Sequence, residues 1–481
     1  MTELIENHPL AELKVGDSAS LTRNFTMDDV QTFALMSGDV NPSHVDAAFA
    51  ASDPFHNVVA HGMWSAALIS NLLGTQLPGP GTVYLGQNLQ FLKPVVLGDT
   101  VRVTVTVTAI DTPSGHSPRA TLHCSVVNQR NDTVVQGDAQ VLVPTEKISR
   151  PRVHLPRLEL RDPGVKLRAL VAQAQAAASG RAPLAMAVVH AVDAVSLGGA
   201  VDAAQAGLIA PVFVGPEAKI RAAAVAAGID LGPYPIVATA HSHAATAQAV
   251  AMARAGEVQA LMKGSLHTDE LMHAVVDAEN GLRTARRISH VFAIDAVGQP
   301  RLQLLTDAAV NVTPDLEAKR GIVQNAIDLA HALGIAQPKV AILSAVETVN
   351  PKIPSTIDAA ALCKMAERGQ IQGGLLDGPL AFDNAVSRRA AQTKGIVSEV
   401  AGDADILVAP DLEAGNMLAK QLEYLADAKV AGIVLGARVP VVLTSRADLP
   451  DARLASCALA VLLALAAERT VAPSQNPMTS A

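Results

Sequence analysis

A carboxylate and an imidazole stand five residues apart near the start of the chain. Between Asp39 and His44, Pro42 predicts a loop, because proline lacks an amide donor and disfavours a continuing helix. In a loop both side chains can point at one water molecule, from which one group takes a proton while the other returns one. This chemistry adds water across an activated double bond. The plainer alternative is a pair that only caps the loop.

An apolar helix is expected over residues 62–73 (GMWSAALISNLL). It begins at Gly62, whose exposed amide at the positive helix end could hold a thioester carbonyl as it becomes an enolate. His61 is expected to fix the turn into this helix. Period-two alternation in Val101–Ile110, and in parts of Arg119–Val127 and Val134–Val143, predicts antiparallel strands. The sheet must wrap around the helix, which gives an α+β unit.

The ordered motifs DVNPSHVD, VAHGM and LPGPGTVYLGQNLQFLKPVVLGDTV resemble the MaoC-like (R)-specific enoyl-CoA hydratases. The resemblance implies a hot-dog fold, in which a sheet wraps around a central helix, and dimerisation. It implies that Asp39 and His44 activate water while Gly62 binds the carbonyl. It also places Asn41 and Ser65 near the substrate, although the residues on either side of Ser65 are less typical of the family.

A second group of reactive residues follows an apolar strand near the end of the sequence. The segment VPVVLT is followed by Ser445, Arg446 and, two residues later, Asp448. Ligands bind where strands end in open α/β sheets. A hydroxyl and a guanidinium suit phosphate or a tetrahedral oxyanion, and a carboxylate could deprotonate a thiol. The plainer alternative is a helix N-cap with a surface ion pair.

Three further segments, LMKG, LDGPLAFD and ADILVAPDLEAGN, stand in the order found in phosphate acetyl- and butyryltransferases. The similarity runs from about residue 183 to residue 467. These enzymes move an acyl group between CoA and orthophosphate. The resemblance implies that Ser445 stabilises the thioester end and that Arg446 binds phosphate or the oxyanion. It also implies that Gly415 and Asn416 line the cleft.

Two assignments stay open in this second group. The family places a phosphate-binding arginine before a strand, and either Arg286 or Arg287 fits that position. The base is either Asp448 or Asp451, with Asp451 slightly favoured by its spacing and Asp448 a possible cap.

Composition excludes several classes of function. The 12 aromatic residues (1 Trp, 3 Tyr, 8 Phe) leave little surface for stacking bases, and the net charge of -8 disfavours a polyanion, so no nucleic acid partner is expected. Three distant cysteines indicate no disulfide framework and a reducing, cytoplasmic location. No signal peptide is expected, and Leu454–Ala467 is too short to span a membrane and is predicted to be a buried helix. His190, His241 and His243 are each expected to be a cap or a satisfied polar group rather than a metal ligand, and no metal is expected.

The 481 residues divide into a hot-dog hydratase domain (1–145), a Pro/Arg-rich extended linker (146–164), a transferase domain (165–472) and a disordered tail (473–481). In the transferase, short apolar runs alternate with alanine-rich stretches, which predicts an α/β domain of two lobes with largely parallel sheets. We expect a bifunctional homo-oligomer acting on acyl-CoA, CoA and phosphate without a cofactor. The alternatives are a hot-dog unit that only senses acyl-CoA or assembles the protein, and a transferase unit that is only a scaffold.

Overall fold

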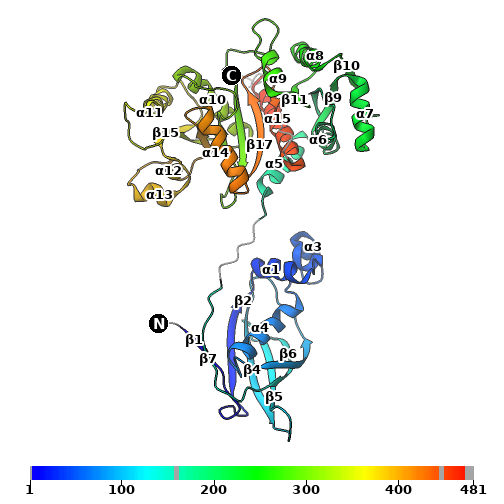
Figure 1. Cartoon of the computed structure of the whole chain (residues 1–481), viewed down its shortest axis with the longest axis vertical. Coiled ribbons are helices and arrows are strands. Elements are labelled where there is room, and N and C mark those ends of the chain that lie inside the picture. Colours follow the sequence, from blue (N-terminus) through cyan, green and yellow to red (C-terminus); the bar gives the residue numbers. More distant parts are fainter. Residues whose placement is uncertain (1–2, 156–161, 444–448, 472–481) are drawn as a thin grey trace, which may run out of the picture. The chain divides into compact units, whose positions relative to one another are not determined.

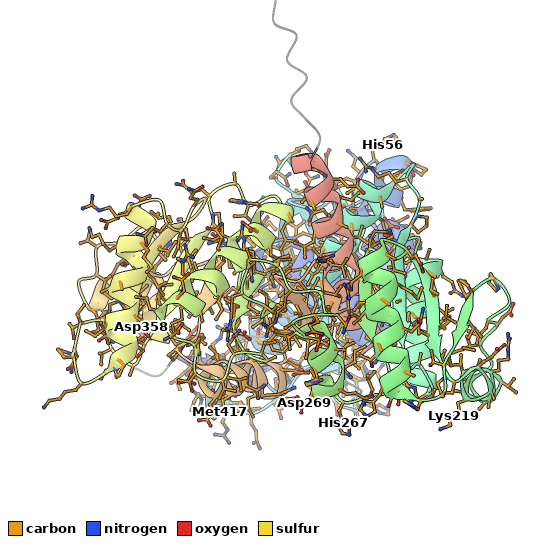
Figure 2. The ribbon with its side chains drawn as sticks, turned by 90° about the horizontal axis from the view of Figure 1, so that it is seen from above. His56, Lys219, His267, Asp269, Asp358 and Met417 are labelled. Atoms are coloured by element: carbon orange, nitrogen blue, oxygen red, sulfur yellow. The ribbon has the colours of Figure 1, made fainter. Side chains whose placement is uncertain are left out.

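The computed structural model describes residues 3–155, 162–443 and 449–471, and the chain divides into two compact units, Met1–Arg161 and Asp162–Ala481. Figure 1 shows a sheet around a central helix in the first unit and a long sheet covered by helices in the second.

The first unit is built on a five-stranded antiparallel sheet in the order β2-β4-β5-β6-β3. The helix α4 packs against β4 and β2, with Ile69 and Leu72 fully buried among the valines of β4. The predicted helix and three predicted strands are confirmed within a few residues. The elements of this core are β2 (Ser18–Asn24), α4 (Gly62–Thr75), β3 (Val83–Phe91), β4 (Thr100–Asp111), β5 (Arg119–Asn128) and β6 (Thr133–Leu142).

Three short helices lie between β2 and α4: α1 (Met27–Ser37), α2 (Pro42–Val45) and α3 (Ala47–Ser52). The prediction of a loop through His44 is wrong, because Pro42 opens α2. Proline is tolerated at the first helical position, where no amide donor is needed. The side-chain oxygen of Asn41 caps this helix by accepting from the amide of Ser43.

The start of the linker belongs to the first unit. Residues Ser149–Pro151 form β7, which pairs antiparallel with β1 (Leu4–Glu6). Exposed ion pairs also join Lys147 to Glu12 and Arg152 to Glu3.

The second unit contains one mixed sheet of eleven strands in the order β10-β9-β8-β11-β18-β17-β12-β13-β16-β14-β15. Most neighbours are parallel, as predicted, but β17 is antiparallel to β18 and β12, and β13 is antiparallel to β12. The strands are β8 (Leu184–Val189), β9 (Ile209–Gly215), β10 (Ile236–Ala238), β11 (Ala260–Lys263), β12 (Ser289–Asp295), β13 (Gln303–Thr306), β14 (Lys339–Leu343), β15 (Leu375–Leu380), β16 (Ile406–Val408), β17 (Lys429–Leu435) and β18 (Val441–Val442).

The antiparallel strands in the middle reverse the direction of the sheet. The strands β8, β9, β10, β11 and β18 therefore finish at one end of the sheet, which we call the first-lobe end. The strands β13, β14, β15 and β16 finish at the opposite, second-lobe end. Between them, β12 has 7 residues and rises about 3.3 Å per residue, so the two ends are about 20 Å apart.

Helices cover the sheet of the second unit, as Figure 1 shows. They are α5 (Val165–Ala178), α6 (Ala194–Gln205), α7 (Glu217–Ala227), α8 (Ser242–Ala255), α9 (Thr268–Val275), α10 (Leu316–Ala332), α11 (Pro354–Glu367), α12 (Phe382–Val386), α13 (Arg388–Thr393), α14 (Leu412–Leu425) and α15 (Pro450–Val471). Within the described residues, α15 is the one helix long and apolar enough to cross a membrane. It packs on α5 and β17, and Ala455, Cys457 and Leu459 are fully buried, so the predicted buried helix is confirmed.

Candidate functional site

Asp39 and His44 come together from two neighbouring segments of the first unit. Asp39 follows the left-handed Gly38 that ends α1, and its carboxylate accepts from the amide of Asn41 at 3.2 Å. On α2, the Nδ1 atom of His44 lies 2.8 Å from the carbonyl oxygen of Val59. Because that oxygen can only accept, Nδ1 carries a proton, and the neutral ring keeps its lone pair on Nε2. The chemistry of the pair therefore allows it to accept and return protons.

A third polar side chain completes this cluster. Ligand atoms of Asp39, His44 and His61 all lie within 4.8 Å of one another. Among the residues that the structure describes, this is the group of His, Cys, Asp and Glu side chains whose spacing could hold a metal ion. A carboxylate with two imidazoles is a ligand set that zinc accepts.

Gly62 lies at the start of α4, beside a cavity of about 320 Å³. No side chain caps this helix, so the amides of its first turn point outward without a capping group. A Cβ atom at Gly62 would lie 3.1 Å from the ring of Phe91, so that ring would have to shift by a few tenths of an ångström to admit a larger residue. Ser65, which is buried, lines the same cavity. Asn41, in contrast, uses its side-chain oxygen to cap the helix of His44.

The first-lobe end of the second unit holds one of the predicted transferase residues that the structure describes. Asp451 is exposed in the first turn of α15 and lines a cavity of about 300 Å³ with Lys429 and Tyr424. Ser445, Arg446 and Asp448 lie outside the described residues. They follow β18, which runs parallel to β11 with Met262 opposite Val442.

Several helices begin at this first-lobe end. The helices α6, α8 and α9 follow the strands β8, β10 and β11, and α15 follows β18. Helix N-termini attract anions through their free amides and their dipoles.

His241 caps α8 by accepting from the amide of Ala244, as expected, and His243 pairs with Glu270 at 3.1 Å. Burial lowers the pKa of His190, against the opposing effect of Glu270.

The second-lobe end holds four other predicted residues in two places. Arg286 and Arg287 precede β12 and line a cavity of about 910 Å³. Arg286 pairs with Asp328 at 3.0 Å. On α14, the side chain of Asn416 donates to the carbonyl of Ala308 at 3.1 Å. A Cβ atom at Gly415 would lie 2.5 Å from the carbonyl oxygen of Asp307, so α14 can pack here only with a glycine.

The predicted transferase residues therefore fall at both ends of the sheet. The register of β12 with β17 places Ser289 beside Leu435 and Asp295 beside Lys429. Arg286 and Arg287 precede Ser289, so they lie at the end of the sheet where Ser289 faces Leu435. Asp451 lines a cavity with Lys429, so it lies at the end where Lys429 faces Asp295. The described residues of one chain thus do not bring Asp451 together with Arg286, Arg287, Gly415 and Asn416.

Sequence reasoning missed a buried polar network at the second-lobe end. The carboxylate of Asp307 accepts from the backbone amides of Ala309, Val310 and Asn311 and from the side-chain amide of Asn311. Both Asp307 and Asn311 are less than 5% exposed. Burial also lowers the pKa of His290, so this histidine is neutral, although the Asp307 carboxylate opposes the effect. The sequence feature that could have indicated this network is the set of polar residues directly after the strand QLLT, because ligands bind where strands end.

Comparisons with known proteins match the two units separately. A family model for phosphate acetyl/butaryl transferase matches residues 236–461, and a model for a MaoC like domain matches residues 11–121. A phosphate acetyltransferase of Rhizobium meliloti is 64% identical over 289 residues, which cover 60% of this chain and 92% of that protein.

Solved structures give likenesses to both units. The crystal structure of a branched-chain phosphotransacylase from Enterococcus faecalis V583 is 29% identical, with a TM-score of 0.52, and the match covers 58% of this chain and 99% of that chain. The unliganded R-hydratase PhaJ1 from Pseudomonas aeruginosa is 43% identical, with a TM-score of 0.31, over 33% of this chain and 100% of that chain. The assignment of the first unit rests on the family model. The predicted order of two folds in one chain is confirmed.

Proposed function

The chain belongs to the phosphate acetyl/butyryl transferase family and carries a MaoC-like domain ahead of the transferase, and we propose that both units catalyse reactions of acyl-CoA thioesters. The second unit transfers an acyl group between CoA and orthophosphate. The first hydrates trans-2-enoyl-CoA to (R)-3-hydroxyacyl-CoA, or runs in reverse as a dehydratase. Both reactions use substrates that contain a CoA thioester, and neither requires a redox cofactor.

The observation that carries the hydratase proposal is the spacing of Asp39, His44 and Gly62. A carboxylate and an imidazole with a free Nε2 stand together, and the uncapped start of α4 lies beside the cavity. One of the pair removes a proton from water as the oxygen bonds to C3, and the other delivers a proton to C2. The amide of Gly62 stabilises the negative charge on the thioester oxygen between these events.

The transferase proposal rests on family membership and on the polar groups at the ends of the sheet. A phosphate oxygen attacks the thioester carbonyl, the C–S bond breaks, and CoA leaves as a thiol once the sulfur takes up a proton. We propose that Ser445 and Arg446 stabilise the tetrahedral oxyanion and the phosphate. Asp448 or Asp451 exchanges the proton with the thiol. Arg286 or Arg287 binds phosphate. Because these arginines lie at the opposite end of the sheet from Asp451 in one chain, this role requires a second copy of the chain to bring them to the thioester.

Two assays on the full chain test both activities. Loss of the conjugated double bond of crotonyl-CoA reports hydration, and release of CoA thiol from butyryl-CoA that depends on phosphate reports transfer. We expect Asp39→Asn to abolish hydration and leave transfer intact. Ser445→Ala should lower transfer at least 100-fold and leave hydration intact. Each variant is the folding control for the other.

The outcomes separate the proposal from its alternatives. Phosphate-dependent thiol release without any loss of crotonyl-CoA would favour a first unit that only senses acyl-CoA or assembles the protein. Hydration without phosphate-dependent release would favour a second unit that serves as a scaffold. Transfer that stays normal in Ser445→Ala, Arg446→Ala and Asp451→Asn would contradict the proposed transferase site.

A further inference from the structure

His61 is a buried imidazole that contacts both members of the hydration pair. It is 2% exposed, and its Nε2 atom lies 2.9 Å from the carbonyl oxygen of Asp39. Because a carbonyl oxygen only accepts, Nε2 carries the proton and donates it. The ring centroid lies 4.0 Å from that of His44, with 33° between the planes.

The side chain of His61 does not serve its own helix. His61 is the N-cap residue of α4, yet its side chain makes no capping hydrogen bond there. It reaches back instead to a residue 22 positions earlier. Its ring also lies 4.9 Å, centroid to centroid, from that of Phe33 on α1. His61 thus joins α1, the segment of Asp39 and α2 to the start of α4.

The hydrogen bond from His61 links the backbone of Asp39 to another segment of the first unit. The other hydrogen bonds of Asp39 that the structure describes are local: its amide donates to the hydroxyl of Ser37, and its carboxylate accepts from the amide of Asn41, both at 3.2 Å. These two bonds join residues that are two positions away in the chain. The bond from His61 is the one that ties the backbone of Asp39 to α4, among the hydrogen bonds that the structure describes.

We propose that His61 is a positioning residue for hydration. Its Nε2–H fixes the backbone of Asp39 and its ring fixes the plane of His44, so that carboxylate and imidazole face the same water. This inference rests on the hydratase activity proposed above. His61 itself makes no contact with the reacting atoms in this assignment.

Two substitutions separate the hydrogen bond from the ring contact. His61→Phe keeps an aromatic ring against His44 and loses the donor, whereas His61→Gln keeps an N–H donor and loses the ring. We expect His61→Phe to lower kcat for crotonyl-CoA about 10-fold, the effect of one lost hydrogen bond. KM should change less than about 2-fold, because the substitution does not alter contacts that hold the substrate equally in the ground state and the transition state. His61→Gln should recover kcat to within about 3-fold of the wild type.

A matched control and a stability measurement complete the experiment. His116→Phe makes the same change at an exposed histidine between β4 and β5, and it should behave as the wild type. Thermal unfolding is followed for every variant. A role in packing alone would make the Gln variant, which loses the ring, worse than the Phe variant in both stability and kcat. That order would overturn the inference. The assays include a chelator, so that no metal held by Asp39, His44 and His61 contributes.

Failure of the inference and failure of the proposed function give different results. If the wild type hydrates crotonyl-CoA, Asp39→Asn is inactive and His61→Phe keeps full kcat, only the positioning role of His61 is overturned. If the wild type shows no hydration while it still transfers acyl groups, the hydratase function is overturned and the positioning role with it.

Discussion

The guanidinium of Arg287 is held by the side-chain amide of Asn311, whose Oδ1 accepts from Nε at 2.7 Å. Asn311 donates in turn to the carbonyl of Ile288 at 2.9 Å and to the buried carboxylate of Asp307. Since the bond to Arg287 involves Nε, the two terminal amino groups of the guanidinium keep a fixed plane for bidentate contact with phosphate. Arg286, in contrast, forms a pair with Asp328 in which both side chains are nearly half exposed.

The contact of Arg287 with Asn311 predicts that Arg287, rather than Arg286, binds phosphate. We expect Arg287→Ala to raise the KM for phosphate in the transfer assay at least 10-fold, and Asn311→Ala to raise it several-fold, because the loose guanidinium loses orientation. Arg286→Ala should change it less than about 2-fold, as for an exposed ion pair. Phosphate titrations of CoA release measure all three. Equal effects of the two arginine substitutions would contradict the assignment to Arg287.

Gly415 is predicted to be needed for the packing of α14. A Cβ atom there would lie 2.5 Å from the carbonyl oxygen of Asp307 and 3.1 Å from the Cα atom of Ala308, and backbone atoms cannot swing away. Gly415→Ala should therefore destabilise the second unit by about 2 kcal/mol and lower transfer, because Asn416 moves with the helix. Chemical denaturation measures the stability.

Gly198 provides the control for that substitution. It lies within α6, and its Cβ would meet only the end of the Ile229 side chain at 4.0 Å. Gly198→Ala should leave stability unchanged or raise it by about 0.5 to 1 kcal/mol, through the better helix propensity of alanine. A Gly415→Ala variant as stable as Gly198→Ala would refute the packing argument.

Asp403 is predicted to make the second unit sensitive to acid. Its hydrogen bond from Lys339 and its contacts with Arg301 lower the pKa of the carboxyl to about 2, although partial burial opposes the effect. A carboxyl whose pKa is lower in the folded state stabilises the fold above its ordinary pKa, and this stability is lost as the pH falls toward 2. Asp403→Asn should cost about 1 to 2 kcal/mol at pH 7, with allowance for solvent screening.

Thermal unfolding between pH 7 and pH 2.5 measures this effect. The difference between the wild type and Asp403→Asn should shrink as the pH falls. Asp427→Asn is the matched control, because Asp427 is 82% exposed and lies 3.7 Å from Lys429. A difference that stays constant over this pH range would exclude Asp403 as the titrating group.

The edge strand of the first unit is predicted to pair with a second copy of the chain. β3 is hydrogen-bonded to β6 on one side and is the last strand of its sheet. Val83 and Leu85 are 52% and 46% exposed, and an exposed apolar edge strand is a site for strand pairing. The double substitution Val83→Lys and Leu85→Lys should lower the average molar mass measured by light scattering. An unchanged mass would exclude β3 as an interface.

Local sequence patterns determined most elements of this protein. The alternation in Val101–Ile110 predicted β4, and the apolar run Leu454–Ala467 predicted the buried part of α15. These predictions succeed because a repeat of two, or a continuous apolar run, has one stable way to bury its side chains. The order of the motifs also identified two folds in one chain. Each motif is a continuous stretch of residues, so it can be recognised without knowledge of the tertiary structure.

Long-range pairing decided what the sequence left open. The antiparallel strands β17 and β12 place Asp451 and Arg287 at opposite ends of one sheet, and no local pattern encodes that reversal. In the same way, only packing brought His61 back to the carbonyl of Asp39, 22 residues earlier. The sequence by itself determined which groups are available for chemistry. Tertiary structure decided which of them meet, because strand register and helix packing depend on contacts between distant residues.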